Sequence, residues 1–172
     1  GLAAAAGDYV VFLDADDWLY PDAVKQVVAR MSSGVAQVQY RLHLVNHQGR
    51  IIDVLPPPEV KFDAGNVVPI LLARGRYENT VTSGNAFARA TLAEIMPVPE
   101  ERFRISADGY LVTVAPFCGT VVAIEEPLGA YAVHGANNWT GGAGRAAEPA
   151  KLRRAIAHDF DRYEALRDHA AR

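Results

Sequence analysis

Residues 8–18 constrain the fold most, because an apolar run ends there in three carboxylates. The β-branched and aromatic residues of the run predict a strand, and Pro21 at a first helical position predicts a helix soon after it. Asp14, Asp16 and Asp17 therefore lie in a strand-to-helix loop. Ligands of open α/β sheets bind at the carboxyl ends of strands, and a hard divalent cation stabilises neighbouring carboxylates. The segment predicts a metal site that receives an anionic group.

The composition is that of one globular domain. The chain has 172 residues, of which 50% are hydrophobic and 22% charged, enough for one core. A formal net charge of -3 gives no general attraction to nucleic acid, so we expect no nucleic-acid partner. The single cysteine, Cys118, excludes an internal disulfide framework and a multi-cysteine zinc site. No apolar run in the sequence approaches the roughly 18 residues that a helix needs to cross a bilayer.

Strand and helix patterns follow one another along the chain and predict an α/β fold. Strands are expected at about 8–13, 35–46, 51–55, 83–89, 120–125 and 128–134. Helices are expected after Pro21, from Asp63 to about Arg74, at 91–96, at 106–117 and from Pro149 onward. The last helix is amphipathic, and we expect its apolar face to pack on the domain or on a partner chain. That face consists of Leu152, Ile156, Phe160, Tyr163 and Leu166.

Four short motifs occur in order along the chain. The first two are Asp14-Ala-Asp16 behind its strand and Ser83-Gly84-Asn85-Ala-Phe. The other two are Ala107-Asp108-Gly-Tyr-Leu at a predicted helix start and Tyr131-Ala-Val-His134 before a glycine-rich segment. Together they resemble the family 2 glycosyltransferases of the GT-A fold. The resemblance implies a GT-A-like mixed sheet flanked by helices, and an inverting enzyme that moves a sugar from a nucleotide-diphosphate sugar to an acceptor hydroxyl.

The resemblance also implies roles on the donor side. Asp14 and Asp16 would hold a Mn²⁺ or Mg²⁺ ion that bridges the donor diphosphate, with Asp17 beside them. His134 would lie next to the metal or the diphosphate, and the glycine-rich loop after it would close over the donor. A metal suits this reaction because it stabilises the charge of the leaving diphosphate without a proton transfer.

On the acceptor side, the resemblance makes Asp108 the general base that takes the proton of the attacking hydroxyl. Gly84, Asn85 and Trp139 are candidates for acceptor contacts, Trp139 because its ring can stack on a sugar. The sequence departs from the family at one point: the acidic pair of the family is often Glu-Asp, and Ala107 stands at the position of the Glu.

The resemblance predicts two parts in this chain. Residues 1–148 form the metal and acceptor side of a GT-A glycosyltransferase domain, and residues 149–172 form the C-terminal helix. The chain opens on a segment that looks like the end of a helix, without an initiator methionine. We therefore expect the nucleotide-binding half of the domain to lie upstream of Gly1, so that the fold is incomplete at the N-terminus and the fragment is inactive alone.

The expected partners follow from this assignment. They are a nucleotide-diphosphate sugar donor and a saccharide, lipid-linked or cell-envelope acceptor. A homo-oligomer and a peripheral contact with a membrane are also compatible with the sequence. We expect a cytoplasmic location, including the inner face of the membrane.

Two other functions fit parts of the sequence. A haloacid-dehalogenase-like phosphatase would use Asp14 as nucleophile and Asp16 as acid, but that family has Thr or Val where this chain has Trp18. A non-catalytic acceptor-binding or assembly fragment would use an exposed sheet edge to pair with another chain.

Simpler structural roles also exist for single residues. Asp17 could cap the helix that Pro21 opens, and Asp108 could be an acid placed at a helix N-terminus, where the macrodipole favours an anion. His134 could be an ordinary residue at a strand end. The other four histidines, which are expected to face solvent, are His43, His47, His158 and His169.

Overall fold

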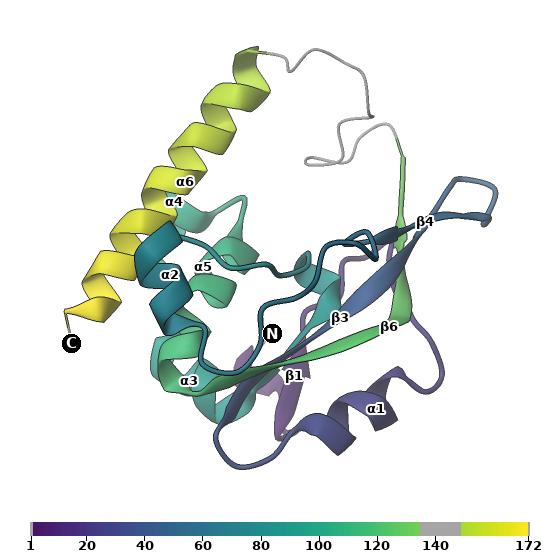
Figure 1. The fold of residues 1–172 in the computed structure, drawn as a ribbon, viewed down its shortest axis with the longest axis horizontal. Coiled ribbons are helices and arrows are strands. Elements are labelled where there is room, and N and C mark those ends of the chain that lie inside the picture. The colour runs from purple at the N-terminus through teal and green to yellow at the C-terminus, as the bar shows by residue number, and fades with distance from the viewer. Residues whose placement is uncertain (1, 135–148, 172) are drawn as a thin grey trace.

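The computed structural model describes residues 2–134 and 149–171, which form one mixed sheet with helices on both faces (Figure 1). The strands are β1 (Tyr9–Val11), β2 (Trp18–Leu19), β3 (Val35–Val45), β4 (Ile51–Leu55), β5 (Asn85–Ala88) and β6 (Thr120–Ala132). The helices are α1 (Ala23–Arg30), α2 (Val68–Arg74), α3 (Arg89–Ile95), α4 (Glu100–Phe103), α5 (Ala107–Val114) and α6 (Pro149–Ala170). Short 3₁₀ turns lie at Leu2–Ala4, Thr82–Gly84 and Ala115–Cys118. The predicted α/β class with a C-terminal helix is confirmed.

The sheet is organised around β3 and β6, which pair in parallel over most of their length. The strand order is β1-β5-β3-β6-β2, and β4 pairs with β3 beyond the end of β5. All the other pairs are antiparallel. The sequence predicted two strands at 120–125 and 128–134, which was wrong, because β6 is one strand whose register against β3 shifts near Pro127. The shift accommodates a proline without ending the strand.

Two apolar clusters fill the space between the sheet and the helices. One contains Ala23 and Val27 of α1, packed on Val38 and Tyr40 of β3. The other lies on the opposite face and joins residues of α2, α3, α5 and α6 to Phe87 of β5 and to β6. Alternate strand residues point to opposite faces, so Val38, Tyr40 and Leu42 of β3 lie in the first cluster. The residues between them, Gln37, Gln39 and Arg41, are buried polar side chains on the other face. None of the helices in the described ranges is long and apolar enough to cross a membrane.

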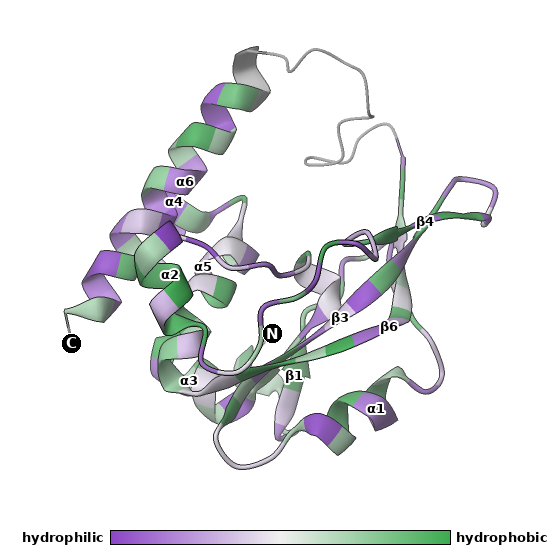
Figure 2. Ribbon diagram, viewed as in Figure 1, coloured by the Kyte–Doolittle hydropathy of each residue, from purple (hydrophilic) through white to green (hydrophobic). Residues whose placement is uncertain are grey.

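The helix α6 packs on the domain through a different face from the one that its sequence predicts. It contacts α4 and α5, and Ala165 and Leu166 are buried in the second cluster. Leu166 is the one member of the predicted apolar face that is buried. The exposed fractions of the others are 53% for Leu152, 49% for Ile156, 68% for Phe160 and 54% for Tyr163. The alternating colours of α6 in Figure 2 include these exposed apolar positions.

Candidate functional site

The loop that carries Asp14, Asp16 and Asp17 joins β1 to β2 and is held from below by Ser83. The backbone N–H of Asp14 donates to Ser83 Oγ at 3.0 Å, and the Tyr40 hydroxyl donates to the Ser83 carbonyl at 2.8 Å. Ser83 is completely buried. The loop therefore has a fixed position relative to β3 and β5, which flank Ser83. The motif analysis named Ser83 only as the start of its segment and missed this anchoring role, because the partner lies far away in sequence.

Asp17 turns inward and ties the loop to the end of β6. Its side chain is 8% exposed, and its Oδ1 accepts a hydrogen bond from the Ala132 N–H at 3.0 Å. Its Oδ2 makes no hydrogen bond of normal geometry with the described residues, although the Ser83 hydroxyl lies near enough to lower the pKa of the carboxyl. Desolvation outweighs these contacts and raises the pKa of Asp17. Asp17 does not cap α1, because this helix begins at Ala23 and Asp22 occupies its N-cap position.

Asp16 faces outward, and the end of β6 brings His134 to it. His134 Nε2 lies 2.7 Å from Asp16 Oδ2, and both side chains are nearly half exposed. Although the two residues are far apart in the chain, the structure places them at one end of the sheet. This is the position that the motif order suggested for His134, beside the acidic loop.

Asp14 is the residue of the acidic loop that interacts with the start of α5. The pKa of its carboxyl is raised first by desolvation and then by the charges of Asp17, Asp108 and Asp16. Asp108 therefore lies within electrostatic range of Asp14, so the fold brings the first and third motifs together. The charges of Asp17, Asp108 and Asp16 all act on Asp14, and their repulsion favours the binding of a cation or a proton there.

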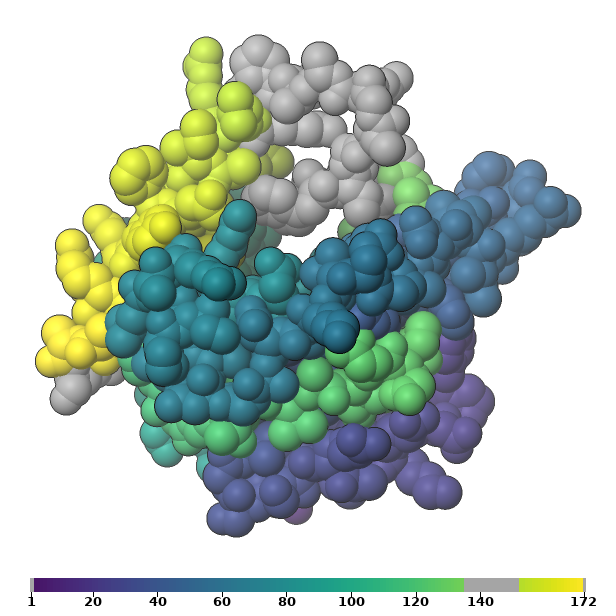
Figure 3. Space-filling model, viewed as in Figure 1, coloured from purple at the N-terminus to yellow at the C-terminus, as the bar shows by residue number. Residues whose placement is uncertain are grey.

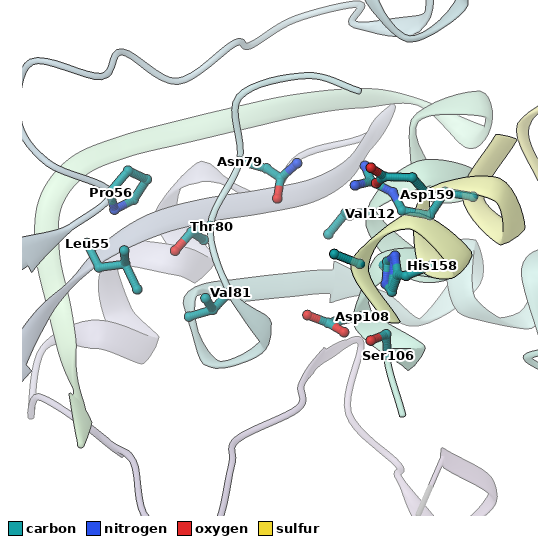
Figure 4. Close-up of a pocket in the computed structure, with 13 residues that line it drawn as sticks. Leu55, Pro56, Asn79, Thr80, Val81, Ser106, Asp108, Val112, His158 and Asp159 are labelled. Atoms are coloured by element: carbon teal, nitrogen blue, oxygen red, sulfur yellow. The ribbon is translucent and has the colours of Figure 1, made fainter. Parts of the chain in front are cut away.

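Asp108 opens onto a cavity of about 340 Å³ between α5, α6 and the end of β4. Figure 4 shows Asp108 and Ser106 on the same side as His158 and Asp159 of α6, and Thr80 and Val81 on the opposite side with Leu55 and Pro56. Asp108 is half-buried in the first turn of α5, where the helix dipole favours its negative charge. The volume lies within the range of small-molecule sites.

Arg162 of α6 also lines this cavity and is a residue that the sequence did not single out. Its Nε donates to Thr113 Oγ1 of α5 at 3.1 Å, and its Nη2 is buried without a hydrogen-bond partner among the described residues. Desolvation lowers the pKa of the guanidinium, while the charges of Asp159 and Asp108 act in the opposite direction. Its helical position gave no signal, because a charged residue on an amphipathic helix is normally solvated.

His158 does not face solvent as predicted. It is half-buried against the Cα of Gly109 and the ring of Phe103. The same correction applies to His43, which binds the Tyr20 hydroxyl, and to His169, which binds the Ala165 carbonyl. His47 is exposed as expected.

The candidates for acceptor contacts lie elsewhere. Asn85 is 1% exposed, and its side chain binds Gln37, Thr80 and Val81 inside the domain. Gly84 is also buried, and a Cβ there would lie 2.8 Å from the Tyr40 carbonyl oxygen. Both residues are buried under the acidic loop, where they support the sheet and do not reach an acceptor at the surface. Trp139 lies outside the described residues.

The acidic loop offers only part of the ligand set that a divalent cation needs. Among the described residues no three His, Cys, Asp or Glu side chains converge as a ready set of metal ligands. Mg²⁺ and similar ions are commonly held by one or two carboxylates together with substrate phosphates and water. Asp14 and Asp16 supply two hard oxygen ligands, and the pKa of Asp14 is raised by desolvation first and then by the neighbouring acids. The residues present fit a cation that binds together with a phosphorylated substrate.

The sequence is similar to known proteins over part of its length. Residues 1–56 match the model of the family described as "Glycosyl transferase family 2". The chain is 32% identical over 139 residues to an uncharacterized glycosyltransferase of Nostoc sp.. That alignment covers 80% of the chain and 43% of the relative, so the chain spans less than half the length of this protein.

The fold is similar to that of TarS of S. aureus. The TarS 1–349 complex with UDP superposes with a TM-score of 0.54 at 15% identity, covering 98% of this chain and 48% of TarS 1–349. The complex with UDP-GlcNAc gives a TM-score of 0.52 at 13% identity, covering 98% and 49%. At these identities the likeness concerns the fold, and the mixed sheet with flanking helices is that of TarS.

Proposed function

We propose that this chain carries the metal and acceptor side of an inverting family 2 glycosyltransferase. The enzyme moves a sugar from a nucleotide-diphosphate sugar to an acceptor hydroxyl. The observation that supports this most is the proximity of Asp14 to Asp108, whose charges interact across the fold. A phosphate-binding group and a basic group must face the two sides of one sugar in such a reaction, and Asp14 and Asp108 lie near enough to interact electrostatically.

On the donor side, Asp14 and Asp16 would hold Mn²⁺ or Mg²⁺. The ion supplies positive charge that stabilises the negative charge of the departing nucleoside diphosphate. His134 holds Asp16 through its Nε2 and so orients that carboxylate. Asp17 fixes the loop to β6 through Ala132. TarS binds UDP and UDP-GlcNAc, which supports a nucleotide sugar as the donor class.

On the acceptor side, Asp108 acts as the general base. The acceptor enters the cavity between α5 and α6, and the Asp108 carboxylate accepts the proton of the hydroxyl that attacks the anomeric carbon. Attack from the face opposite the leaving diphosphate inverts the configuration. Ala107 stands where the family often has a Glu, so Asp108 is the one carboxylate of this motif that can take the proton.

Binding of Mn²⁺ to the chain tests the donor side. Electron paramagnetic resonance of free Mn²⁺, with and without UDP, should report binding to the unaltered chain and at least a tenfold weaker affinity in Asp16→Ala, about 1.4 kcal/mol. Asp22→Ala is the matched control, because Asp22 is exposed just before α1 and makes no capping hydrogen bond. Equal Mn²⁺ binding by the two variants would contradict the assignment. If the chain hydrolyses p-nitrophenyl phosphate and Asp14→Asn abolishes this activity, the chain is a haloacid-dehalogenase-like phosphatase and not a glycosyltransferase.

A further inference from the structure

A second pocket lies beside the Asp108 cavity and is lined by three arginines. Its volume is about 250 Å³, and it is formed by Arg74, Gly75 and Arg76 after α2 together with Asp159, Arg162 and Tyr163 of α6. Asp159 and Arg162 line both pockets. The two pockets therefore adjoin, and a ligand longer than a single sugar can occupy both.

The pocket has a well-defined structure. Gly75 ends α2 in the left-handed conformation with φ of 73°, and a Cβ there would lie 2.4 Å from the ring of Tyr163. The ring of Tyr163 therefore packs directly on the chain turn that ends α2. These helices adjoin in the ribbon and in the space-filling view (Figures 1 and 3). The turn fixes the direction in which Arg74 and Arg76 leave the backbone.

The charges in this pocket are unbalanced. Three guanidinium groups face one carboxylate, that of Asp159, in a chain whose net charge is negative. The side chains of Arg74 and Arg76 make no hydrogen bond or ion pair within the described ranges, and the charge of Arg76 acts on Arg162. Surface arginines in last helical turns are common because they complement the helix dipole. That explanation covers Arg74, but it does not cover Arg76 or the buried, unpaired Nη2 of Arg162.

We infer that the arginines Arg74, Arg76 and Arg162 bind an anionic group, phosphate or carboxylate, of the acceptor whose hydroxyl reaches Asp108. This rests on the proposed function. Guanidinium groups bind phosphate and carboxylate through paired, charge-assisted hydrogen bonds. Asp159, between the two pockets, accepts hydrogen bonds from hydroxyls of the connecting part of the acceptor and disfavours a second anion nearer Asp108. The acceptor class is therefore an anionic saccharide or polyol, with its charge set apart from the reacting hydroxyl.

The test is an NMR titration of the ¹⁵N-labelled chain at constant ionic strength with glucose 6-phosphate, glucuronate and glucose. Glucose 6-phosphate or glucuronate should shift the amide signals of 74–76 and of the middle of α6 and bind at least about tenfold tighter than glucose. The double variant Arg74→Gln with Arg76→Gln should lose this preference, and both sites are exposed, so the fold is kept. Arg50→Gln in the exposed turn between β3 and β4 is the matched control and should keep it. The two anions distinguish phosphate from carboxylate, and either one supports the inference.

Three results would overturn the inference: equal binding of glucose and both anions, an anion preference that survives in the double variant, or a loss of preference in Arg50→Gln of the same size. Mn²⁺ binding on the same samples separates this outcome from failure of the proposed function. The double variant should bind Mn²⁺ normally, and Asp16→Ala should keep its anion preference. Anion binding in a chain whose Mn²⁺ affinity does not depend on Asp16 would remove the acceptor role.

Discussion

At the residue scale, some polar groups of the candidate site hold the acidic loop in place, and others face the surface. Ser83 receives the Asp14 N–H, and Asp17 receives the Ala132 N–H, so these two residues hold the loop. Asp14 and Asp16 then remain for a ligand at the surface. Adjacent acids in one motif thus have different environments, which is how neighbouring carboxylates acquire different roles.

The raised pKa of Asp14 leads to a prediction on stability. A carboxyl whose folded pKa exceeds its unfolded value of 3.8 contributes stability below that value, and the contribution is lost as pH rises through the folded pKa. Near neutral pH the ionised Asp14 therefore destabilises the fold, so Asp14→Asn should raise the free energy of unfolding there. Because solvent screens this exposed group, we expect a gain of a few tenths of a kcal/mol.

Urea unfolding of Asp14→Asn and the unaltered chain at pH 7 and at pH 3.5 measures this gain. It should be present at pH 7 and shrink at pH 3.5, and Mn²⁺ binding should be lost in the same variant. A variant that is more stable than the unaltered chain but binds Mn²⁺ less tightly is expected when the replaced residue serves function. A variant that is less stable at pH 7 would mean that Asp14 is a structural group.

At the element scale, α6 shows that periodicity identifies a face without identifying its neighbour. Its apolar stripe is exposed, while His158, Arg162 and Leu166 turn to α5. Arg162 gains a hydrogen bond from its Nε to Thr113 there, and His158 fits over Gly109, which has no side chain. The contact depends on a small residue in another helix, and such a match is invisible in the sequence of α6 alone.

Gly109→Ala tests this contact. In most helix interiors this change stabilises by about 1 kcal/mol, because alanine has the higher helix propensity. Here the new Cβ would lie 2.4 Å from His158 Cε1, so His158 must leave its place. We expect Gly109→Ala to lower the free energy of unfolding by about 1–3 kcal/mol, the usual cost of overpacking.

A double-mutant cycle with His158→Ala supplies the control for Gly109→Ala. In the His158→Ala background the same change should become neutral or stabilising, as helix propensity alone requires. Hydrogen exchange of the α6 amides should accelerate in Gly109→Ala and recover in the double variant. Additive effects of the two changes would show that His158 does not pack on Gly109.

At the scale of the whole molecule, the sequence predicted elements better than their assembly. The strand before Asp14, the β3–β4 hairpin and the C-terminal helix all follow from local patterns. Neighbouring acids in one loop could be recognised locally, whereas the approach of Asp108 to Asp14 depends on the packing of α5. The motif order suggested that approach through a resemblance, and no spacing in the sequence could have derived it.

The parts that could not be predicted share one physical reason. Ser83 under the acidic loop and Arg162 in the cavity acquire their roles from residues far along the chain. The arginine pocket needs the end of α2 to lie next to α6, where the ring of Tyr163 packs on Gly75. Contacts of this kind form only when the chain is packed, and a single sequence does not show which distant residues will meet.

Arg41 links three parts of the molecule beside the cavity that Asp108 lines. It is 3% exposed on β3 and donates to the carbonyls of Pro56 at 2.7 Å, Pro57 at 3.0 Å and Val60 at 2.9 Å. It also pairs with Glu125 of β6. Pro56 is part of the cavity wall, so Arg41 holds that wall against the centre of the sheet.

Arg41→Met should therefore lower the free energy of unfolding by at least about 3 kcal/mol, because several buried carbonyls lose their donor at once. Urea unfolding measures the loss, and hydrogen exchange should show faster opening at the Glu59 and Val60 amides, because residues 56–58 are prolines without an N–H. Glu125→Gln separates the ion pair from the carbonyl bonds: the Glu125 side chain is 55% exposed, so this change should cost less than about 1 kcal/mol. If Glu125→Gln cost as much as Arg41→Met, the ion pair and not the carbonyl bonds would hold the wall. The cavity would then depend on salt, because exposed ion pairs are screened.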